Sequence, residues 1–296
     1  MRSGSRGYVQ PMTTALLDRW IFAKPYFNRD GLIVATDGDK PIGFCHAGFG
    51  PVDDESALST DLGASIMVIV APHADETQIA AQLIARGEQF LRSQGAKVLY
   101  AGGIRPLNAF YLGLYGGSEL PGILDSDAQQ QMFFRAAGYK EIDRTIVLHR
   151  ELAGFRPPVD RQQVMVRRRA SISHVSDPPP HTWWEACTLG EFASVQYRLH
   201  IRGDEQPAAG ATMIDMETFS HTWAVRTAGL IDVWVADAYR RQGFAIFLIS
   251  EIMRRAVEER VGLFEVQTMQ SNTAALELYR KLGFYQVDCG AVFRKP

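Results

Sequence analysis

Paired cysteines, long apolar runs and an excess of one charge are all missing from this 296-residue sequence. Its three cysteines, Cys45, Cys187 and Cys289, lie far apart and cannot all pair, which argues against a disulfide scaffold and favours a reducing cytoplasm. None of them belongs to a cluster with zinc-ligand spacing, so we expect no metal site. The apolar run from Ile66 to Ala71 is as long as a strand, whereas a membrane helix needs about 20 residues.

Charge is nearly balanced, with 31 Lys and Arg against 33 Asp and Glu and a formal net charge of −2. A nucleic-acid-binding protein is usually more basic. The three arginines Arg167–Arg169 lie in a segment that we interpret as a strand, where alternation keeps them from sharing one face. Residues 1–12 include basic residues but lack the apolar core of a secretory signal. We therefore expect a cytoplasmic protein that binds neither nucleic acid nor membrane.

Composition and length favour a globular protein of two domains. The chain is 46% apolar and 22% charged, which is ordinary for soluble proteins. The segment Glu151–Arg161 is rich in proline and glycine, and its Pro157 and Pro158 would end any helix or strand. We therefore predict domains at residues 1–153 and 160–296.

The two halves predict the same order of elements: a strand, an amphipathic helix, a second strand and a shorter helix. We expect these elements at 64–72, 74–95, 96–103 and 127–139 in the first half, and at 229–237, 240–262, 263–269 and 272–284 in the second. The interval from Val70 to Val98 equals the interval from Val235 to Leu263. Equal intervals indicate an internal repeat.

The two copies end alike but differ elsewhere. Gly138 and Gly283 each follow the last residue of the shorter helix, where a left-handed residue belongs. The first copy carries an insertion at 107–126 and opens with a helix over 13–23. The second copy shows no early helix, and its segments around 194–203 and 208–216 are predicted strands.

The segment 235–245, VADAYRRQGFA, points to phosphate binding. Arg240, Gly243 and Ala245 form an R-x-x-G-x-A pattern where a helix begins. The unpaired N–H groups and the dipole of a helix start favour a phosphate, and glycine lets the backbone approach it closely. Taken alone, the pattern also fits a solvated, arginine-rich helix start.

Together with the strand FEVQT and the following helix, this segment resembles the GNAT acetyltransferase superfamily. The helix carries the pattern N-x-x-A-x-x-L-Y-x-x-L-G-F at Asn272, Ala275, Leu278, Tyr279, Leu282, Gly283 and Phe284. The resemblance is good over 229–284, weaker over 160–228 and weaker again in the first half. It implies a mixed α/β (α+β) fold of two tandem GNAT-like domains. Each domain would have a mixed, mainly antiparallel central sheet flanked by helices.

The resemblance also implies catalytic roles. The strand 230–235 would splay from its neighbour at a bulge, and the backbone N–H near Val233 would stabilise the oxyanion. Tyr279 would give a proton to the departing thiolate. Asp232 stands where many members carry an acidic residue, and it is either a base or amine-binding group or a solvated strand residue. Glu265 is a second candidate base.

For acetyl-CoA, the resemblance implies contacts from three places. Backbone groups of Val235 would pair with the pantetheine, and Asn272 and Tyr279 would lie beside the cofactor arm. The pyrophosphate would be held by Arg240, Arg241, Gln242, Gly243, Phe244 and Ala245.

The first copy lacks these features. In place of Arg240, Arg241 and Gly243 it has Asp75, Glu76 and Gln78, and Phe134 stands in place of Tyr279. Two carboxylates would repel a pyrophosphate, and phenylalanine has no proton to give. We expect this half neither to catalyse nor to bind CoA. Its insertion would either cover the acceptor site of the second half or pack as a surface loop.

The sequence thus predicts an N-acetyltransferase that moves the acetyl group of acetyl-CoA directly to a primary amine of a small molecule or peptide. The alternative is a non-catalytic acyl-CoA-binding or regulatory protein. The acceptor, the acyl-chain preference, the general base and the oligomeric state are left open.

Overall fold

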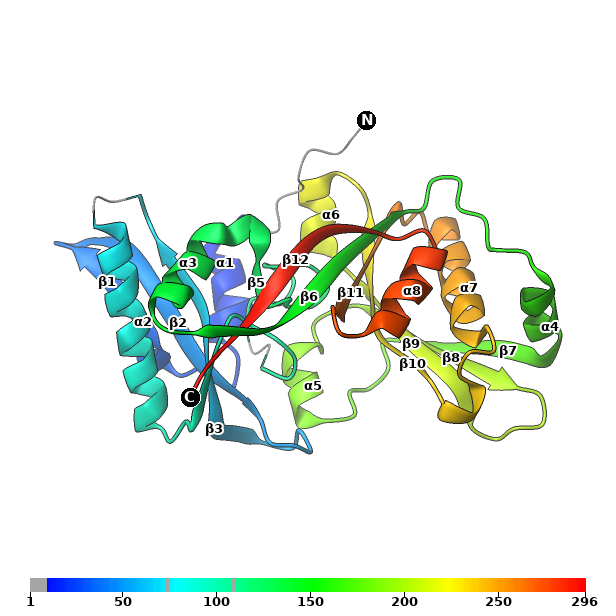
Figure 1. Ribbon diagram of the computed structural model, residues 1–296, viewed down its shortest axis with the longest axis horizontal. Coiled ribbons are helices and arrows are strands. Elements are labelled where there is room, and N and C mark those ends of the chain that lie inside the picture. The colour runs from blue at the N-terminus through cyan, green and yellow to red at the C-terminus, as the bar shows by residue number, and fades with distance from the viewer. Residues whose placement is uncertain (1–9, 73–74, 108–109) are drawn as a thin grey trace.

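A single twisted sheet runs through both halves of the molecule in the computed structural model (Figure 1). The structure describes residues 10–72, 75–107 and 110–296. Outside it lie residues 1–9 of the N-terminal segment, 73–74 of the first-half loop and 108–109 of the expected insertion. The strands of the 12-stranded sheet follow the order β1-β2-β3-β4-β12-β6-β11-β10-β9-β8-β7, and β5 pairs with β12 beside this path.

The first half supplies the sheet strands β1–β6 and three helices, with short helical turns at 18–22, 29–31 and 125–127. The bounds are α1 (Thr14–Leu17), β1 (Leu32–Asp37), β2 (Lys40–Pro51), β3 (Leu58–Val70), α2 (Glu76–Ser93), β4 (Val98–Ala101), β5 (Ile123–Leu124), α3 (Ala128–Ala136) and β6 (Lys140–Glu151).

The second half repeats this order of elements. It has additional short helices before its sheet strands and a 3-10 turn at 237–239. The bounds are α4 (Arg161–Arg169), β7 (Ala170–Ser176), α5 (Trp183–Thr188), β8 (Ser194–Ile201), β9 (Pro207–Asp215), α6 (Glu217–Trp223), β10 (Thr227–Val235), α7 (Phe244–Glu258), β11 (Leu263–Met269), α8 (Thr273–Lys281) and β12 (Tyr285–Lys295).

The last strand of each half lies in the sheet of the other half. Strand β6 pairs with β11, β12 pairs with β4, and β6 and β12 pair with each other at the centre of the molecule (Figure 1). Neither residues 1–153 nor residues 160–296 therefore contain all the strands of their own part of the sheet. The domain boundary predicted between them remains a prediction from the sequence.

The sheet register confirms the internal repeat residue by residue. Strands β3 and β4 pair in parallel from Leu62↔Val98, and β10 and β11 pair from Thr227↔Leu263. Leu62 is the equivalent of Thr227, and Val98 is the equivalent of Leu263, in agreement with the matched intervals of the sequence. Gly138 and Gly283 have φ angles of 87° and 78°, which confirms both left-handed helix ends.

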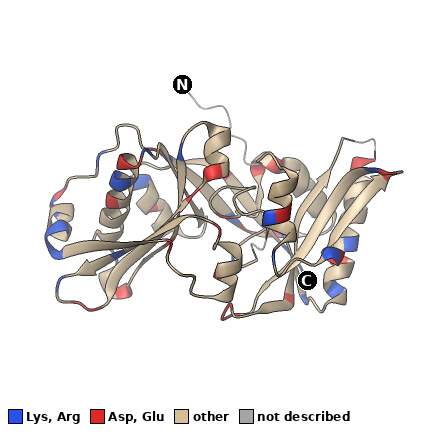
Figure 2. Ribbon diagram, turned by 180° about the vertical axis from the view of Figure 1, so that it is seen from behind, with Lys and Arg blue, Asp and Glu red and all other residues tan. Residues whose placement is uncertain are grey.

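The strand expected around Arg167–Arg169 is wrong, because these residues end helix α4. Asp160 caps this helix by accepting the N–H of Gln163 at 2.8 Å. Arg167 is ion-paired with Glu251 of α7 at 2.7 Å, so α4 packs on a helix and forms no free basic strand. Figure 2 shows basic and acidic residues interspersed over both halves.

The second half also has an early helix, contrary to expectation. Helix α5 starts at Trp183, where Thr182 accepts the N–H of Glu185 at 3.0 Å. The expected first-half helix is present as α1 and the turn that continues it to Phe22.

The insertion is buried between the two halves, so its interpretation as a surface loop is wrong. Phe110, Tyr111 and Leu114 are each 5% exposed or less. They share an apolar cluster with Trp184 of α5 and Trp20 of the first half. This cluster joins the two halves on one face of the sheet. Helix α7 and the second-half core cover the opposite face.

Two kinds of site are not found in the described part of the chain. No helix there is long and apolar enough to cross a membrane. No group of three or more His, Cys, Asp or Glu residues is arranged there to hold a metal ion.

Candidate active site

A gap opens in the sheet where β10 parts from β11. Their parallel pairing stops at Leu230↔Val266, although the strands continue to Val235 and Met269. On the other edge of β10, the register with β9 shifts between Ile231 and Trp234. Asp232 within this shift has φ 52°, a left-handed angle. The predicted bulge and splay are therefore confirmed.

The backbone of β10 directs an N–H group into this gap. Ala236 donates its N–H to the carbonyl of Ala208 in β9 at 2.9 Å. Because N–H groups alternate between the two edges of a strand, that of Val235 points to the β11 side. Val233 lies within the bulge, and the side chains of both valines pack against the second-half core. Val235 can therefore offer a backbone donor to a ligand in the gap.

The first half fills the same place with its own side chain. Val68 occupies the position of Val233 in the repeat, and its N–H donates to Oε1 of Gln130 at 3.0 Å. Gln130 is 3% exposed, and its Nε2 donates to Asp127 at 2.7 Å. The equivalent of Gln130 in α8 is Ala275, whose methyl group cannot reach across. The amide carbonyl of Gln130 thus closes the gap in the first half. In the second half, Ala275 has this position, and its short side chain does not close the gap.

The loop before α7 has the backbone shape of an anion site. Arg241 and Gly243 have φ angles of 60° and 87°, and no side chain caps the first turn of α7. A Cβ at Gly243 would lie 2.9 Å from Cδ of the flexible Gln162 side chain, so the left-handed φ angle, more than a collision, favours glycine here. Arg240 is exposed and ion-paired with Asp237 at 2.7 Å. Successive free N–H groups with nearby arginines fit a pyrophosphate.

Other residues of the predicted loop contribute backbone rather than side chains. Gln242 turns its Nε2 back to the carbonyl of Ala238 at 2.8 Å. Phe244 is 2% exposed and belongs to the core. In the first half, α2 begins at Glu76 and Gln78 lies inside the helix. The described part of that loop has no left-handed residue comparable with Gly243.

Helix α8 carries Asn272 at its N-cap and Tyr279 near its end. Asn272 is exposed and caps the helix, accepting the N–H of Ala275 through Oδ1 at 3.2 Å. Tyr279 is buried against Phe284, with ring centroids 5.4 Å apart. Burial, and then the nearby carboxylate of Glu119, raise the pKa of Tyr279 well above its usual value. The phenol is therefore protonated at neutral pH.

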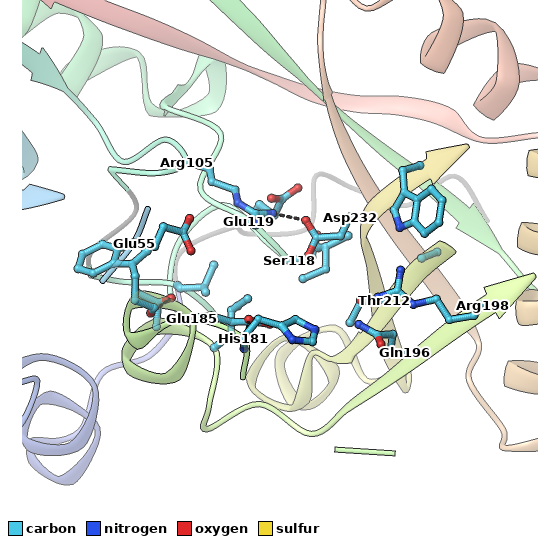
Figure 3. Close-up of a pocket in the computed structure, with 17 residues that line it drawn as sticks. Glu55, Arg105, Ser118, Glu119, His181, Glu185, Gln196, Arg198, Thr212 and Asp232 are labelled. Atoms are coloured by element: carbon cyan, nitrogen blue, oxygen red, sulfur yellow. Dashed lines mark hydrogen bonds and ion pairs between the residues drawn. The ribbon is translucent and has the colours of Figure 1, made fainter. Parts of the chain in front are cut away.

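A pocket of about 220 Å³ opens at the bulge and is lined by both halves (Figure 3). Asp232 and Trp234 face it from β10, as strand alternation predicts. The other polar lining residues are Glu55, Arg105, Ser118, Glu119, His181, Glu185, Thr188, Gln196, Arg198 and Thr212.

Charged side chains of the first half meet Asp232 in this pocket. Arg105 forms an ion pair with Asp232, drawn as a dashed line in Figure 3. Burial raises the pKa of Glu119 to about 7, an effect that Arg105 opposes and that Asp232 and Glu265 increase. Neither Arg105 nor Glu119 was predicted from the sequence. Their only signal was a position in or beside an insertion that was expected to cover the acceptor site.

Glu265 is an anchor within the protein and does not line the pocket. It is fully buried and accepts the N–H of Ser118 at 2.7 Å and Nε2 of Gln267 at 3.1 Å. His149 of β6 contacts its other oxygen at 3.4 Å. This network ties the insertion to β11.

The chain matches the Acetyltransferase (GNAT) family over residues 6–116 and 160–284, which is most of its length. None of the curated proteins compared with the chain matches it.

Solved structures share the fold at low sequence identity. A GCN5-related glucosamine N-acetyltransferase region of a fungal multi-domain GH3 beta-N-acetylglucosaminidase has a TM-score of 0.66 and 18% identity, covering 88% of this chain. The chain spans only 32% of that longer protein. A tandem GNAT protein from the clavulanic acid biosynthesis pathway has a TM-score of 0.60 and 13% identity, covering 91% of this chain and 84% of that one. A GCN5-related N-acetyltransferase from Sphaerobacter thermophilus has a TM-score of 0.55 and 16% identity, covering 89% and 79%.

These likenesses agree with the tandem arrangement of the two halves and with the mixed, mainly antiparallel sheet. Matches to both halves account for the repeat that the sequence and the sheet register share. The chain belongs to the GNAT family of acetyltransferases and has its two-domain, tandem architecture.

Proposed function

We propose that this protein transfers the acetyl group of acetyl-CoA directly to a primary amine, and that its second half is the active one. The observation that carries the proposal is the gap between β10 and β11. It lies between the loop before α7 and the pocket that both halves line. A pantetheine arm in the gap would bring a thioester to the N–H of Val233. The uncapped first turn of α7 would hold the pyrophosphate.

The lining of the pocket favours a small, cationic acceptor. The pocket is lined by four carboxylates, at Glu55, Glu119, Glu185 and Asp232, and by the two arginines Arg105 and Arg198. The carboxylates in excess of the arginines would attract an ammonium group and hold it beside the bulge. Its volume of about 220 Å³ suits a small molecule or the end of a peptide.

Each predicted catalytic group has a part in this scheme. Acetyl-CoA supplies the activated acetyl group. The N–H of Val233 stabilises negative charge that develops on the carbonyl oxygen. Tyr279 protonates the leaving sulfur. Asp232, with Arg105, orients the amine.

The first half acts as a structural partner that shapes the acceptor pocket. Gln130 occupies its gap, Glu76 lies at its helix start, and Phe134 replaces the tyrosine. We accordingly propose one acetyl-CoA site per chain. The free cysteines fit action in a reducing cytoplasm.

Calorimetric titration with acetyl-CoA and a thiol-release assay test the proposal. The amine panel is glucosamine, ethanolamine, tyramine and spermidine. Glucosamine is included because the fungal relative is described as a glucosamine N-acetyltransferase region. One site per chain with amine-dependent thiol release supports the proposal. Binding without release from any amine would favour the acyl-CoA-binding alternative, and two sites would contradict the inactive first half.

A further inference from the structure

The first-half insertion is locked onto the strands of the proposed active centre. Ser118 donates its N–H to Glu265 of β11 at 2.7 Å, and Gln267 Nε2 donates to the carbonyl of Glu119 at 2.9 Å. Only glycines fit at two contact points. A Cβ on Gly117 would collide with the Glu265 carboxylate, and one on Gly229 of β10 would collide with Ser118. The backbone of Glu119 therefore has a fixed place beside β10 and β11.

From this place, the Glu119 side chain lies near charged and titratable groups of several elements. Arg105 approaches from its own half, Asp232 from β10, Glu265 from β11 and Tyr279 from α8. Asp232 lies at the bulge, and Tyr279 is the proposed proton donor to sulfur. Glu119 is thus the carboxylate that lies near both the pocket and the proposed site of C–S cleavage.

Asp232 and Glu119 differ in how they can handle a proton. The Asp232 carboxylate is held in an ion pair by Arg105. Glu119 is partly exposed to the pocket that it lines, and its pKa of about 7 suits a base that accepts and releases a proton near neutral pH. The two carboxylates therefore suit different roles. Asp232 can orient the amine through its charge, and Glu119 can accept the proton.

We propose that Glu119, supplied by the inactive half, is the general base that deprotonates the acceptor amine at the active centre of the second half. This inference rests on the proposed acetyltransferase function. The Glu119 carboxylate takes one proton from the acceptor ammonium and later releases it to solvent. The neutral nitrogen attacks the thioester carbon, so a C–N bond forms and the C–S bond breaks. Tyr279 gives its proton to sulfur, and the second nitrogen proton replaces it, leaving an amide and the CoA thiol.

Glu119→Gln tests the assignment with little change in shape. We measure kcat at saturating acetyl-CoA and the most reactive amine of the panel, across about pH 5 to 9, and expect a loss of about 100-fold or more. The wild-type rise in kcat near neutral pH should flatten, while the Kd for acetyl-CoA stays unchanged. The control is Glu277→Gln, which changes an exposed glutamate on α8 and should keep the wild-type profile.

Neighbouring substitutions identify the titrating group. Asp232→Asn removes a negative charge that raises the Glu119 pKa, so the inflection in kcat should move to lower pH. Arg105→Gln removes a positive charge and should move it to higher pH. Shifts in opposite directions support Glu119.

Three results would overturn the assignment. A Glu119→Gln enzyme with wild-type kcat and pH profile would overturn the base role and leave the acetyltransferase function standing. If the pH dependence of kcat were lost only in Asp232→Asn, Asp232 and not Glu119 would be the general base. A wild-type enzyme that acetylates no amine of the panel would overturn both proposals.

Discussion

Tyr279 and Phe134 occupy equivalent positions in the two halves, and their side chains differ by one hydroxyl group. Both side chains are buried, at 4% and 0% exposure, on the shorter helix of their repeat. Because the fold already accommodates phenylalanine at this position, Tyr279→Phe should fold normally. We expect kcat to fall by about 100-fold or more while acetyl-CoA affinity is kept. Thiol release and calorimetry measure the two quantities, and an unchanged kcat would remove the acid role.

Glu119 also gives stability a pH dependence of known sign. Its folded-state pKa is raised from 4.5 to about 7, so the folded protein favours the protonated form. That stabilisation is complete below the unfolded pKa and is lost as pH rises through about 7. Relative to wild type, Glu119→Gln should therefore gain thermal stability from pH 5 to about pH 8. Thermal melts of both proteins at the two pH values test this, and a relative loss would contradict the raised pKa.

At the scale of elements, the start of α7 decides cofactor binding. Gly243 has φ 87° and lies against Gln162 and Gln163, so a side chain would strain the loop, and a carboxylate would also repel phosphate. We expect Gly243→Asp to weaken acetyl-CoA binding at least about 10-fold, as measured by calorimetry. Gly243→Ala separates strain from charge. Gln78→Asp, the matching change in the first half, should leave affinity unchanged, and an equal loss there would contradict one site per chain.

Local patterns predicted the elements near the active site better than the partners of the final strands. Val70, Val98, Val235 and Leu263 set a register that the sheet reproduces, because a strand–helix–strand unit is defined by neighbours in sequence. The partners of β6 and β12 lie far away in the sequence, and the local sequence of these strands does not specify which sheet they join. The arginines of α4 suggested a strand, but the Asp160 cap and packing on α7 decide the helix. The pKa of Glu119 depends on desolvation, on Arg105 and on Asp232 and Glu265, and the last two are distant in sequence.

For the whole molecule, the exchanged strands and the shared pocket make the halves interdependent. A fragment of residues 160–296 would lack β6, so the edge of β11 would be exposed to aggregation. It would also lack Arg105 and Glu119. We expect this fragment alone to be insoluble or inactive, and co-expression with residues 1–153 to restore activity.

The measurement is thiol release from acetyl-CoA with the most reactive amine, together with the molecular mass of the assembled species. The control is co-expression with a 1–153 fragment that carries Glu119→Gln. This pair should assemble through β6 and β12 but lack the proposed base, so its kcat should match that of the full-length Glu119→Gln protein. Activity of 160–296 alone at the full-length rate would contradict both the structural need for β6 and the catalytic need for Glu119. Restored assembly with restored activity in the Glu119→Gln pair would contradict only the latter.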